Sequence, residues 1–429
     1  MLELLDLRAR RERLEPRRLE IDPSVAETVR GIIRRVRDEG DAALLDLTRR
    51  FDGADLTEPG LLAAPSEIAE AERAVPAELR AAIDALIERL RDLHRRQLPV
   101  AWETEREGVR AAEVVTPLGA VGCYVPGGRA VYPSSVAMTV VPAVVAGVGE
   151  IVLTTPPSAD GSIHPAVLYA AVRSGATGIA KVGGAQAVAA LAYGTASVPA
   201  VDKVVGPGNV YVTEAKRQLA GVVGIDGLAG PSELVLIADA SADPALLATD
   251  LAAQAEHDPE AETTFVTPDE PLLRATLAAL EAEVAAAPRA EVIRASLAAH
   301  GRAVLVADLD QAVQVANDLA PEHLHIVTAE PRALAERIRA AGAVFLGPFT
   351  PVPFGDYGVA SNHVLPTSGT ARFSSGLRTA DFVTVRTVVE CTPAAAASLA
   401  PQVATIAEAE GLAAHARAAR VRTDLGGPR

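Results

Sequence analysis

The middle of the chain alternates short β-branched runs with alanine-rich stretches, and this alternation constrains the fold more than any other feature. Residues 151–154 are predicted to form a buried strand, 164–174 a helix and 178–182 a second strand. A helix at 185–192 and a strand end at 203–206 continue the pattern. Glycine and proline stand at the joints, as is typical of βαβ units around a parallel sheet.

A second block of the same kind predicts another parallel sheet. Its predicted elements are strands at 234–238, 264–267, 304–306 and 343–346 and a helix at 244–257. We therefore expect an α/β protein with two Rossmann-like domains. Neither block carries the spaced triple glycine of the usual dinucleotide fingerprint. Three glycine-rich loops could bring backbone close to a phosphate, but alone they fit any α/β protein.

The two ends of the chain are predicted to be helical. Residues 1–19 contain mixed charges that indicate a solvated helix face. Residues 20–95 are mostly helical by periodicity. From Pro393 onward we expect two helices broken at Gly411, after an extended stretch at 383–389.

Composition argues against several classes of partner. The chain has 55 acidic and 40 basic residues and a net charge of −15, which disfavours nucleic acid and anionic membrane surfaces. Aromatic residues make up only 3%, too few for a base-stacking surface. Two cysteines form neither a disulfide framework nor a thiolate zinc site, which suits a cytoplasmic protein.

No targeting or membrane segment is expected. The N-terminus lacks the basic start and apolar run of a secretory signal. The longest apolar region, 130–149, contains Pro133 and Pro142, so we interpret it as a buried helix or helix pair.

Four of the eight histidines lie in unusual polar contexts, and these suggest one assembled site. They are His257, His323, His363 and His415. Imidazole, carboxylate and amide oxygen form a plausible ligand set for zinc, and an adjacent Glu-His pair resembles acid/base equipment. The set predicts a metal-dependent enzyme built from distant segments.

Gln254 and His257 lie near the end of a helix that Asp258-Pro259 must terminate. At i and i+3 both side chains share a face and could reach one ion. Taken alone, the pair fits a polar helix end better, because glutamine is a rare zinc ligand.

Glu322 and His323 lie in a loop that enters a predicted strand at 324–328, where α/β enzymes often keep catalytic groups. An exposed charged pair is the alternative. Asp356 and His363 lie in a long Gly-, Pro- and Ser-rich stretch, 347–375, and such long irregular loops are usually functional.

Glu410 and His415 are five positions apart, so a straight helix would point them in different directions. Gly411 between them could bend the chain toward a common site. The alternative is that both are surface residues of an amphipathic C-terminal helix.

Together these segments closely resemble histidinol dehydrogenase from about residue 20 to residue 421. The matching motifs are Val36–Asp41, Thr116–Gly122, Tyr124–Gly128, Val182–Ala187, Gly206–Asn209, Thr213–Lys216, Ile225–Asp226, Ala229–Glu233, Pro321–Leu324 and Asn362–Thr367. The resemblance implies an NAD-dependent, zinc-requiring oxidation of L-histidinol through histidinal to L-histidine, the last steps of histidine biosynthesis.

The resemblance also implies roles for individual residues. One Zn²⁺ per subunit would be held by Gln254, His257, Asp356 and His415, and it would bind the substrate rather than change redox state. His323 would be the general base and Glu322 would activate water. The other expected substrate contacts are Ser232, His363 and Glu410, and the expected NAD contacts are Tyr124, Gln186 and Asn209.

The family is a homodimer whose C-terminal segment crosses to the partner, so Glu410 and His415 would complete the other subunit's site. We expect an N-terminal segment 1–19, a discontinuous first α/β domain of 20–123 with 231–376, an NAD-binding domain 124–230 and a tail 377–429. The first domain would carry the zinc and catalytic residues.

One departure and three alternatives remain. Val359-Ala360 stands where the family usually has Ser-Gly, which concerns only local loop shape. A sister enzyme that oxidises another small alcohol, such as a sulfonated diol, would show a changed Glu410 or His363. A zinc hydrolase would leave the NAD-matching residues idle. A non-catalytic scaffold would not need the whole site intact.

Overall fold

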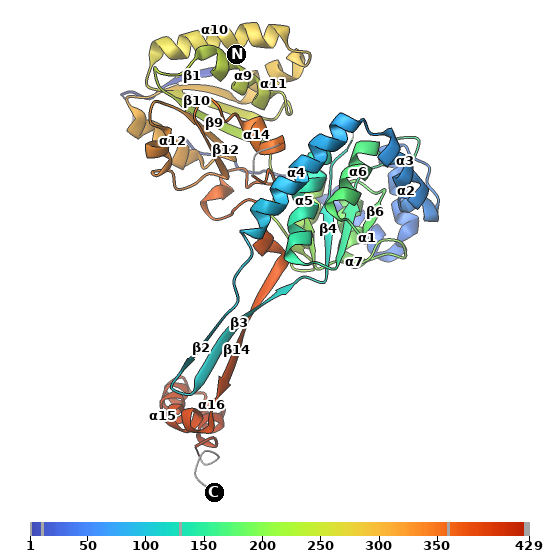
Figure 1. Ribbon diagram of the computed structural model, residues 1–429, viewed down its shortest axis with the longest axis vertical. Coiled ribbons are helices and arrows are strands. Elements are labelled where there is room, and N and C mark those ends of the chain that lie inside the picture. The colour runs from blue at the N-terminus through green and yellow to red at the C-terminus, as the bar shows by residue number, and fades with distance from the viewer. Residues whose placement is uncertain (1, 10–12, 128–130, 358–360, 424–429) are drawn as a thin grey trace. The chain divides into compact units, whose positions relative to one another are not determined.

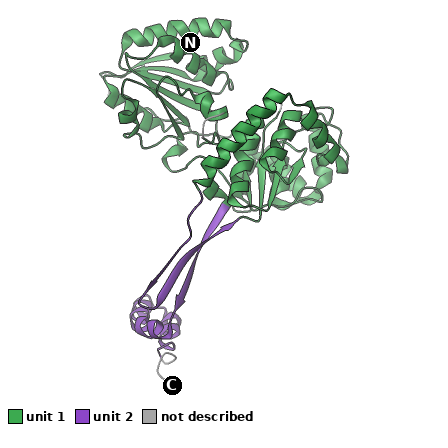
Figure 2. Ribbon diagram, in the orientation of Figure 1, with its two compact units in different colours: residues 1–97, 118–382 green, residues 98–117, 383–429 purple. Residues whose placement is uncertain are grey.

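The computed structural model describes residues 2–9, 13–127, 131–357 and 361–423. It contains two parallel sheets and one antiparallel sheet (Figure 1). The chain forms two compact units, coloured separately in Figure 2. Unit 1 comprises residues 1–97 and 118–382, and unit 2 comprises residues 98–117 and 383–429.

The first sheet of unit 1 has six parallel strands in the order β1–β11–β10–β9–β12–β13. These strands are β1 (Glu3–Asp6), β11 (Gly301–Leu305), β10 (Glu262–Thr267), β9 (Glu233–Ala238), β12 (His323–Val327) and β13 (Ala343–Leu346). The central strands β9 and β12 lie side by side, with His323 opposite Leu234.

Helices cover both faces of this sheet, because successive side chains of β9 point to opposite faces. Leu234 and Leu236 pack in one core with three helices, and Val235 and Ile237 pack in a second core with another helix. The first three helices are α9 (Pro244–Ala255), α10 (Glu270–Ala286) and α11 (Ala290–His300), and the other is α12 (Leu309–Leu319). Short helices α13 (Pro331–Ala335) and α14 (Val352–Tyr357) follow.

The second sheet of unit 1 has five parallel strands in the order β6–β5–β4–β7–β8. These are β6 (Gly178–Ala180), β5 (Glu150–Thr154), β4 (Ala120–Tyr124), β7 (Lys203–Val205) and β8 (Gly224–Ile225). Its connecting helices are α5 (Pro133–Ala146), α6 (Pro165–Ser174), α7 (Gly184–Tyr193) and α8 (Val210–Leu219).

Four N-terminal helices pack around this second sheet: α1 (Pro23–Glu39), α2 (Asp41–Asp52), α3 (Pro65–Ala74) and α4 (Ala77–Arg95). Helix α1 contacts α7 and α8, α3 contacts α6, and α4 contacts α5. The Asp22 side chain caps α1, whose buried residues Val29, Ile32, Ile33 and Val36 form one apolar stripe.

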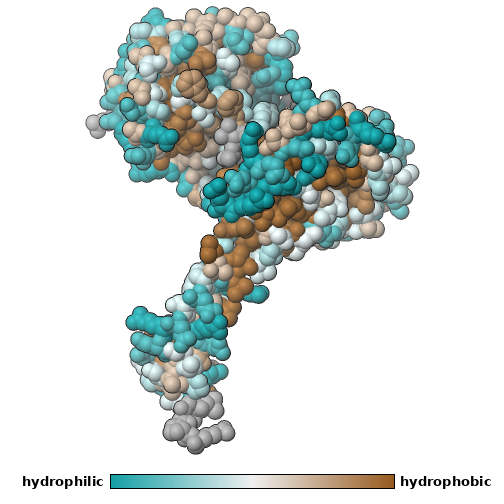
Figure 3. Space-filling view, viewed as in Figure 1, coloured by the Kyte–Doolittle hydropathy of each residue, from teal (hydrophilic) through white to brown (hydrophobic). Residues whose placement is uncertain are grey.

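Unit 2 contains an antiparallel sheet in the order β14–β3–β2 and two helices. Its strands are β2 (Trp102–Arg106), β3 (Val109–Pro117) and β14 (Val383–Cys391), and its helices are α15 (Pro393–Ala409) and α16 (Ala413–Arg420). The two helices pack through a small alanine core, and Gly411 between them has φ +75°. The space-filling view shows apolar surface along this sheet (Figure 3), where Trp102, Val385, Val388 and Val389 are exposed.

The structure confirms the two predicted parallel sheets and the C-terminal helix pair broken at Gly411. The predicted buried helix within 130–149 is α5. No helix of the described chain is both long and apolar enough to cross a membrane.

Two expectations need correction. The predicted helix within residues 1–19 is wrong, because residues 3–6 form β1 and pair in parallel with β11. The expected grouping of 20–123 with 231–376 also differs from the packing, since α1, α3 and α4 contact helices of the five-stranded sheet. Residues 98–117 join the C-terminal segment in unit 2.

Candidate functional site

Three of the predicted site residues meet at one edge of the six-stranded sheet. Ser232 directly precedes β9, Glu322 directly precedes β12, and His323 is the first residue of β12. This is the amino-terminal edge of the sheet, whereas ligands of open α/β sheets usually bind at the carboxyl edge. The prediction that Glu322 and His323 lie where the chain enters a strand is therefore confirmed. They lie at the amino-terminal end of that strand, whereas the general rule favours the carboxyl end.

The Glu322 carboxylate is buried and held by two donors. Oε2 accepts hydrogen bonds from Ser232 Oγ at 2.7 Å and from the backbone N–H of Glu233 at 2.9 Å. Burial disfavours the charged form, but the charge and hydrogen bond of His323 favour it, and these two donors add to that effect. Together they outweigh burial, so the pKa of Glu322 lies below its usual value. The carboxylate is thus ionised and fixed in one orientation.

The His323 ring is held by the same stretch of backbone. Its Nδ1 lies 3.1 Å from the carbonyl oxygen of Glu233 and 3.4 Å from Glu322 Oε2. Both neighbours are acceptors, so Nδ1 carries the proton. Nε2 is buried and has no hydrogen-bond partner among the described residues. A neutral ring would therefore present a free lone pair at Nε2.

The charge state of His323 depends on Glu322. Burial disfavours the protonated ring, but the nearby Glu322 carboxylate attracts its charge and accepts its hydrogen bond. The net effect raises the pKa of His323 to about 9. The two residues thus form an ion pair near neutral pH.

Gln254 joins this network from the last turn of α9. Its Nε2 donates to Ser232 Oγ at 3.1 Å, while its Oε1 is buried and without a partner among the described residues. A buried carbonyl oxygen without a donor is costly unless something binds it. Gln254 therefore has one free oxygen that suits a cation.

The other expected metal residues of unit 1 differ in exposure. Asp356 is a buried residue of α14, and His257 is an exposed residue just after the end of α9. The charge of Asp356 raises the pKa of His363 and the charge of His257 lowers it, although burial is the largest influence. Within the described residues, no three His, Cys, Asp or Glu side chains form a metal-binding group. The expected zinc ligands would not form such a group within unit 1. Gln254 is a glutamine and His415 belongs to unit 2, so only His257 and Asp356 remain.

His363 lies in the loop after α14. Its Nε2 is 3.2 Å from Ser135 Oγ, and its Nδ1 is 3.8 Å from Asp356 Oδ1. Burial lowers the pKa of His363, although the negative charges of Asp356 and Glu322 oppose that effect. The ring is therefore neutral in this environment.

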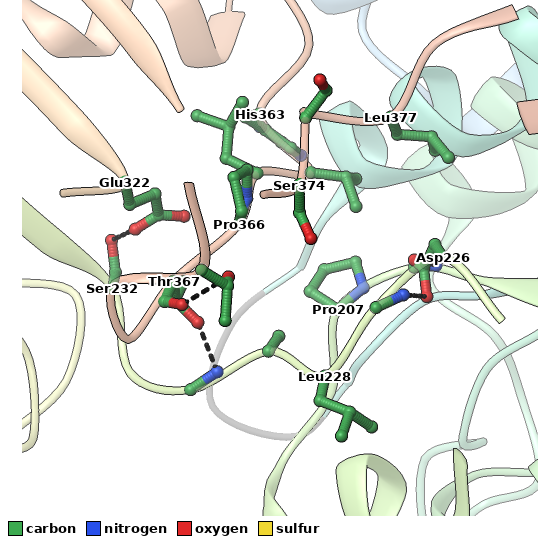
Figure 4. A pocket seen from close by; sticks show the side chains of 18 of the residues that line it. Pro207, Asp226, Leu228, Ser232, Glu322, His363, Pro366, Thr367, Ser374 and Leu377 are labelled. Carbon is green, nitrogen blue, oxygen red and sulfur yellow. Dashed lines mark hydrogen bonds between the residues drawn. The ribbon is translucent and has the colours of Figure 1, made fainter. Parts of the chain in front are cut away.

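Glu322, Ser232 and His363 line one pocket of about 400 Å³. Figure 4 shows Ser232 and Glu322 joined by a hydrogen bond, while Pro207 and Asp226 lie across the pocket. The pocket size suits a small polar substrate rather than a polymer.

A second pocket of about 880 Å³ brings together all three residues expected to bind NAD. Tyr124 ends β4, Gln186 lies in the first turn of α7, and Asn209 follows β7, so this pocket lies at the carboxyl edge of its sheet. Tyr124 Oη accepts a hydrogen bond from the N–H of Gly184 at 3.2 Å, and burial raises the pKa of Tyr124 to about 12. The side chain of Asn209 also caps α8.

Glu410 and His415 belong to unit 2 and are both exposed there. Glu410 is the C-cap residue directly after α15, and His415 lies on α16. The departure at Val359-Ala360 lies outside the described residues, as does Gly128 of one glycine motif.

Sequence reasoning missed three residues that shape the two pockets. Glu233 holds both catalytic candidates through its backbone. Lys216 and Asp226 form a buried ion pair of 2.6 Å, and Asp226 Oδ2 also accepts from the N–H of Gly206 at 2.6 Å. This pair fixes the loop that leads to Asn209. All three lie in the quoted motifs, but no spacing rule indicated their roles.

Comparisons with known proteins agree on one family. The family model described as histidinol dehydrogenase matches residues 15–423. The histidinol dehydrogenase of Halalkalibacterium halodurans is 48% identical over 397 residues, covering 92% of this chain and 93% of the relative. That of Caulobacter vibrioides is 48% identical over 409 residues, covering 95% and 94%.

A solved structure of histidinol dehydrogenase from Elizabethkingia anophelis is also similar. It has a TM-score of 0.93 and 34% sequence identity, covering 99% of this chain and 98% of the other. An acetylating aldehyde dehydrogenase from Geobacillus thermoglucosidasius has a TM-score of 0.50 at 15% identity, covering 86% and 97%, which shows a similar fold alone.

Proposed function

The chain belongs to the histidinol dehydrogenase family, and from this premise we propose that it oxidises L-histidinol through histidinal to L-histidine with NAD and zinc. Membership makes it an oxidoreductase that acts on histidinol in histidine biosynthesis. The finer proposal concerns the cofactors, the residues and the dimer. We place this biosynthetic reaction in the cytoplasm.

One observation carries the proposal: two buried atoms of the assembled network lack partners among the described residues. They are His323 Nε2 and Gln254 Oε1. The first is where a general base would take a proton, and the second is where a ligand oxygen would bind a metal ion. Ser232 links Gln254 to Glu322, the neighbour of His323, because its hydroxyl accepts from Gln254 and donates to Glu322.

In the first oxidation the substrate alcohol loses a proton and a hydride. Neutral His323 takes the hydroxyl proton at Nε2, while Glu233 holds the Nδ1 proton in place. Glu322 then stabilises the imidazolium that forms, since its carboxylate lies 3.4 Å from Nδ1. The product is the aldehyde.

The second oxidation needs one water molecule added to the aldehyde. Glu322 is the proposed group that takes a proton from that water, because its carboxylate is ionised and already oriented by Ser232 and Glu233. The hydrate then loses a second hydride and becomes the carboxylate. One histidinol therefore gives one histidine with two hydride transfers.

The residues of unit 1 fit a zinc ion chemically. Gln254 offers an unpartnered buried oxygen, Asp356 a buried carboxylate and His257 an imidazole. We propose that His415 of a second subunit supplies the fourth ligand. Bound zinc would hold the substrate's amine and imidazole, and it would take no part in electron transfer.

The pocket around Tyr124, Gln186 and Asn209 is the proposed NAD site. Bound NAD would accept the hydride in each oxidation. The volume of this pocket, about 880 Å³, lies within the usual range for cofactor sites.

We further propose a homodimer in which unit 2 serves the partner's site. The support is the exposed apolar surface along its sheet and on α15, where Leu399, Val403 and Ile406 are exposed. Exposed apolar patches of this kind mark interaction surfaces. Glu410 and His415 would then complete the site of the other subunit.

The test is to mix the protein with histidinol and NAD and to record the NADH absorbance band. An increase supports the proposal. A sister enzyme would leave NAD unchanged with histidinol but reduce it with another small alcohol, and a zinc hydrolase or a scaffold would reduce no NAD with either. The single most discriminating result against the proposal is no NADH from histidinol in a zinc-loaded sample.

A further inference from the structure

His94 is a buried histidine near the end of α4 that the proposed mechanism does not use. Its exposure is 0%, and burial lowers its pKa even though a hydrogen bond with Gln97 opposes that effect. Nδ1 lies 2.8 Å from Gln97 Oε1, and Nε2 lies 3.3 Å from Asn362 Nδ2. Both ring nitrogens therefore have polar partners.

The chemistry of these partners defines one arrangement of hydrogens. Asn362 Nδ2 donates to the carbonyl oxygen of Met138 at 2.8 Å, and Asn362 Oδ1 accepts from the N–H of Val364 at 2.9 Å. Nδ2 is thus the amide nitrogen, and its second hydrogen points to His94 Nε2. Nε2 must accept, so the single ring proton lies on Nδ1 and is donated to Gln97.

This network controls the backbone on both sides of His363. The bond from the N–H of Val364 to the side chain of Asn362 forms a turn that encloses His363. Asn362 is 7% exposed and is tied to α4 through His94 and to α5 through Met138. The His363 ring then reaches Ser135, also on α5.

We propose that His94 is a positioning residue for substrate binding: its Nε2 orients Asn362, and Asn362 holds His363 toward the substrate pocket. The proposal rests on the proposed function, because it takes His363 as a contact to histidinol. His94 itself does not line the substrate pocket or the proposed NAD pocket. Its effect should therefore reach the substrate but not the cofactor.

Two substitutions of His94 distinguish the contribution of Nε2 from that of Nδ1. His94→Gln places an amide oxygen near the position of Nε2 and keeps an acceptor for Asn362. His94→Asn places its polar atoms near the position of Nδ1 and leaves Asn362 without that acceptor. We expect His94→Asn to raise the KM for histidinol about tenfold, because a buried donor is left unpaired. We expect His94→Gln to restore most of that loss and both variants to keep the KM for NAD within about twofold.

A double-mutant cycle distinguishes positioning from general loss of structure. In a His363→Ala background, His94→Asn should change the KM for histidinol by less than about twofold, because the residue that it positions is gone. If the factors by which the two substitutions raise the KM for histidinol instead multiply, His94 does not act through His363 and the proposal is overturned. Equal losses in His94→Gln and His94→Asn would also overturn it.

Thermal melting of every variant accompanies the kinetics. If His94→Asn fails to fold, Asn362→Ala removes the same hydrogen bond from its other end and enters the same cycle with the same expected result. A wild-type protein that forms no NADH from histidinol would overturn the proposed function and this inference together. An active wild type with an additive cycle would overturn this inference alone.

Discussion

At the residue scale, the peptide groups of Glu233 determine how the two proposed catalytic side chains are held. The N–H of Glu233 binds Glu322, and its carbonyl oxygen binds His323. The Glu233 side chain is buried, and burial raises its pKa to about 8 although the N–H of Ser368 donates to it. Glu322 is therefore the carboxylate that stays charged beside His323.

The ion pair predicts an alkaline pH dependence. Burial lowers the pKa of His323, but the charge and hydrogen bond of Glu322, together with Asp356 and the Glu233 carbonyl, raise it to about 9. A base must be neutral, and the neutral fraction grows as pH rises through that pKa. We expect kcat/KM for histidinol to increase with pH and to level off above about 9.

The control for this profile is Glu322→Gln, which removes the charge that raises the pKa of His323. Its remaining activity should level off at lower pH than that of the wild type. An unchanged or higher midpoint would show that a different group titrates.

Glu322 should matter more in the second oxidation than in the first, because only hydration of the aldehyde needs an activated water. Glu322→Gln should slow histidinal oxidation by about 100-fold or more and histidinol oxidation by about tenfold. Separate assays from histidinol and from histidinal measure the two. Ser232→Ala, which keeps the carboxylate but removes its hydroxyl donor, should show the same preference for the second oxidation with smaller losses. If Glu322→Gln instead slowed histidinol and histidinal oxidation equally, the proposed role of Glu322 in the second oxidation would be contradicted.

The sequence indicated the positions of the candidate catalytic residues better than it indicated their surroundings. Glu322 and His323 were predicted from their position before a strand, and the structure brings them together with Ser232 and Gln254. The backbone contacts of Glu233 could not be predicted, since they depend on the register between β9 and β12. The proposed role of His94 could not be predicted either, because its partner Asn362 is distant in the chain.

At the element scale, α9 presents two of the proposed zinc residues at its end. The Asp243 side chain begins the helix, and Ala255 ends it shortly before Pro259. Gln254 stays in the last turn and faces Ser232, while His257 follows the helix and is exposed. The predicted i and i+3 pair therefore spans the end of the helix rather than one continuous face.

His257→Ala should lower zinc content by more than about tenfold after dialysis against limiting zinc. The reason is the loss of an imidazole ligand, and metal analysis measures it directly. His300→Ala is the matched control, because His300 lies on α11 and its ring contacts Arg17 and Glu260. Full activity in a rigorously chelated wild-type sample would contradict a zinc requirement.

Strands with strong local patterns were predicted well, and strands defined by distant partners were not. The buried β-branched runs of β5, β9 and β10 stand out in the sequence. Strand β1 has only four residues and two acidic ends, and its partner β11 is far along the chain. Residues 102–117 similarly form β2 and β3 by pairing with each other and with β14.

At the scale of the whole molecule, the residues expected to form the site are divided between the two units. Unit 1 holds Glu322, His323, Gln254, His257 and Asp356, and unit 2 holds Glu410 and His415. The sequence alone predicted the two parallel sheets, but α1, α3 and α4 contact helices of the five-stranded sheet instead of grouping with the six-stranded one. Helix packing depends on which apolar faces fit together, and sequence order does not determine that.

A complementation experiment tests the exchange of unit 2 between subunits. His415→Ala and Glu322→Gln proteins should each be nearly inactive alone. In a mixed dimer, one site combines an unaltered unit 1 with an unaltered unit 2. The other site carries both the Glu322→Gln and the His415→Ala substitutions. At random mixing about half of the dimers are mixed, so we expect roughly a quarter of wild-type activity after co-refolding. No recovery despite confirmed subunit exchange would mean that unit 2 serves its own chain.

The proposed oxidation of histidinol to histidine is tested most directly by the ratio of NADH formed to histidinol consumed, with histidine identified as the product. The proposed pair of oxidations in one site predicts two NADH for each histidinol and no accumulation of free histidinal. One NADH for each histidinol, with histidinal as the final product, would contradict the account. No NADH from a zinc-loaded sample would contradict it entirely.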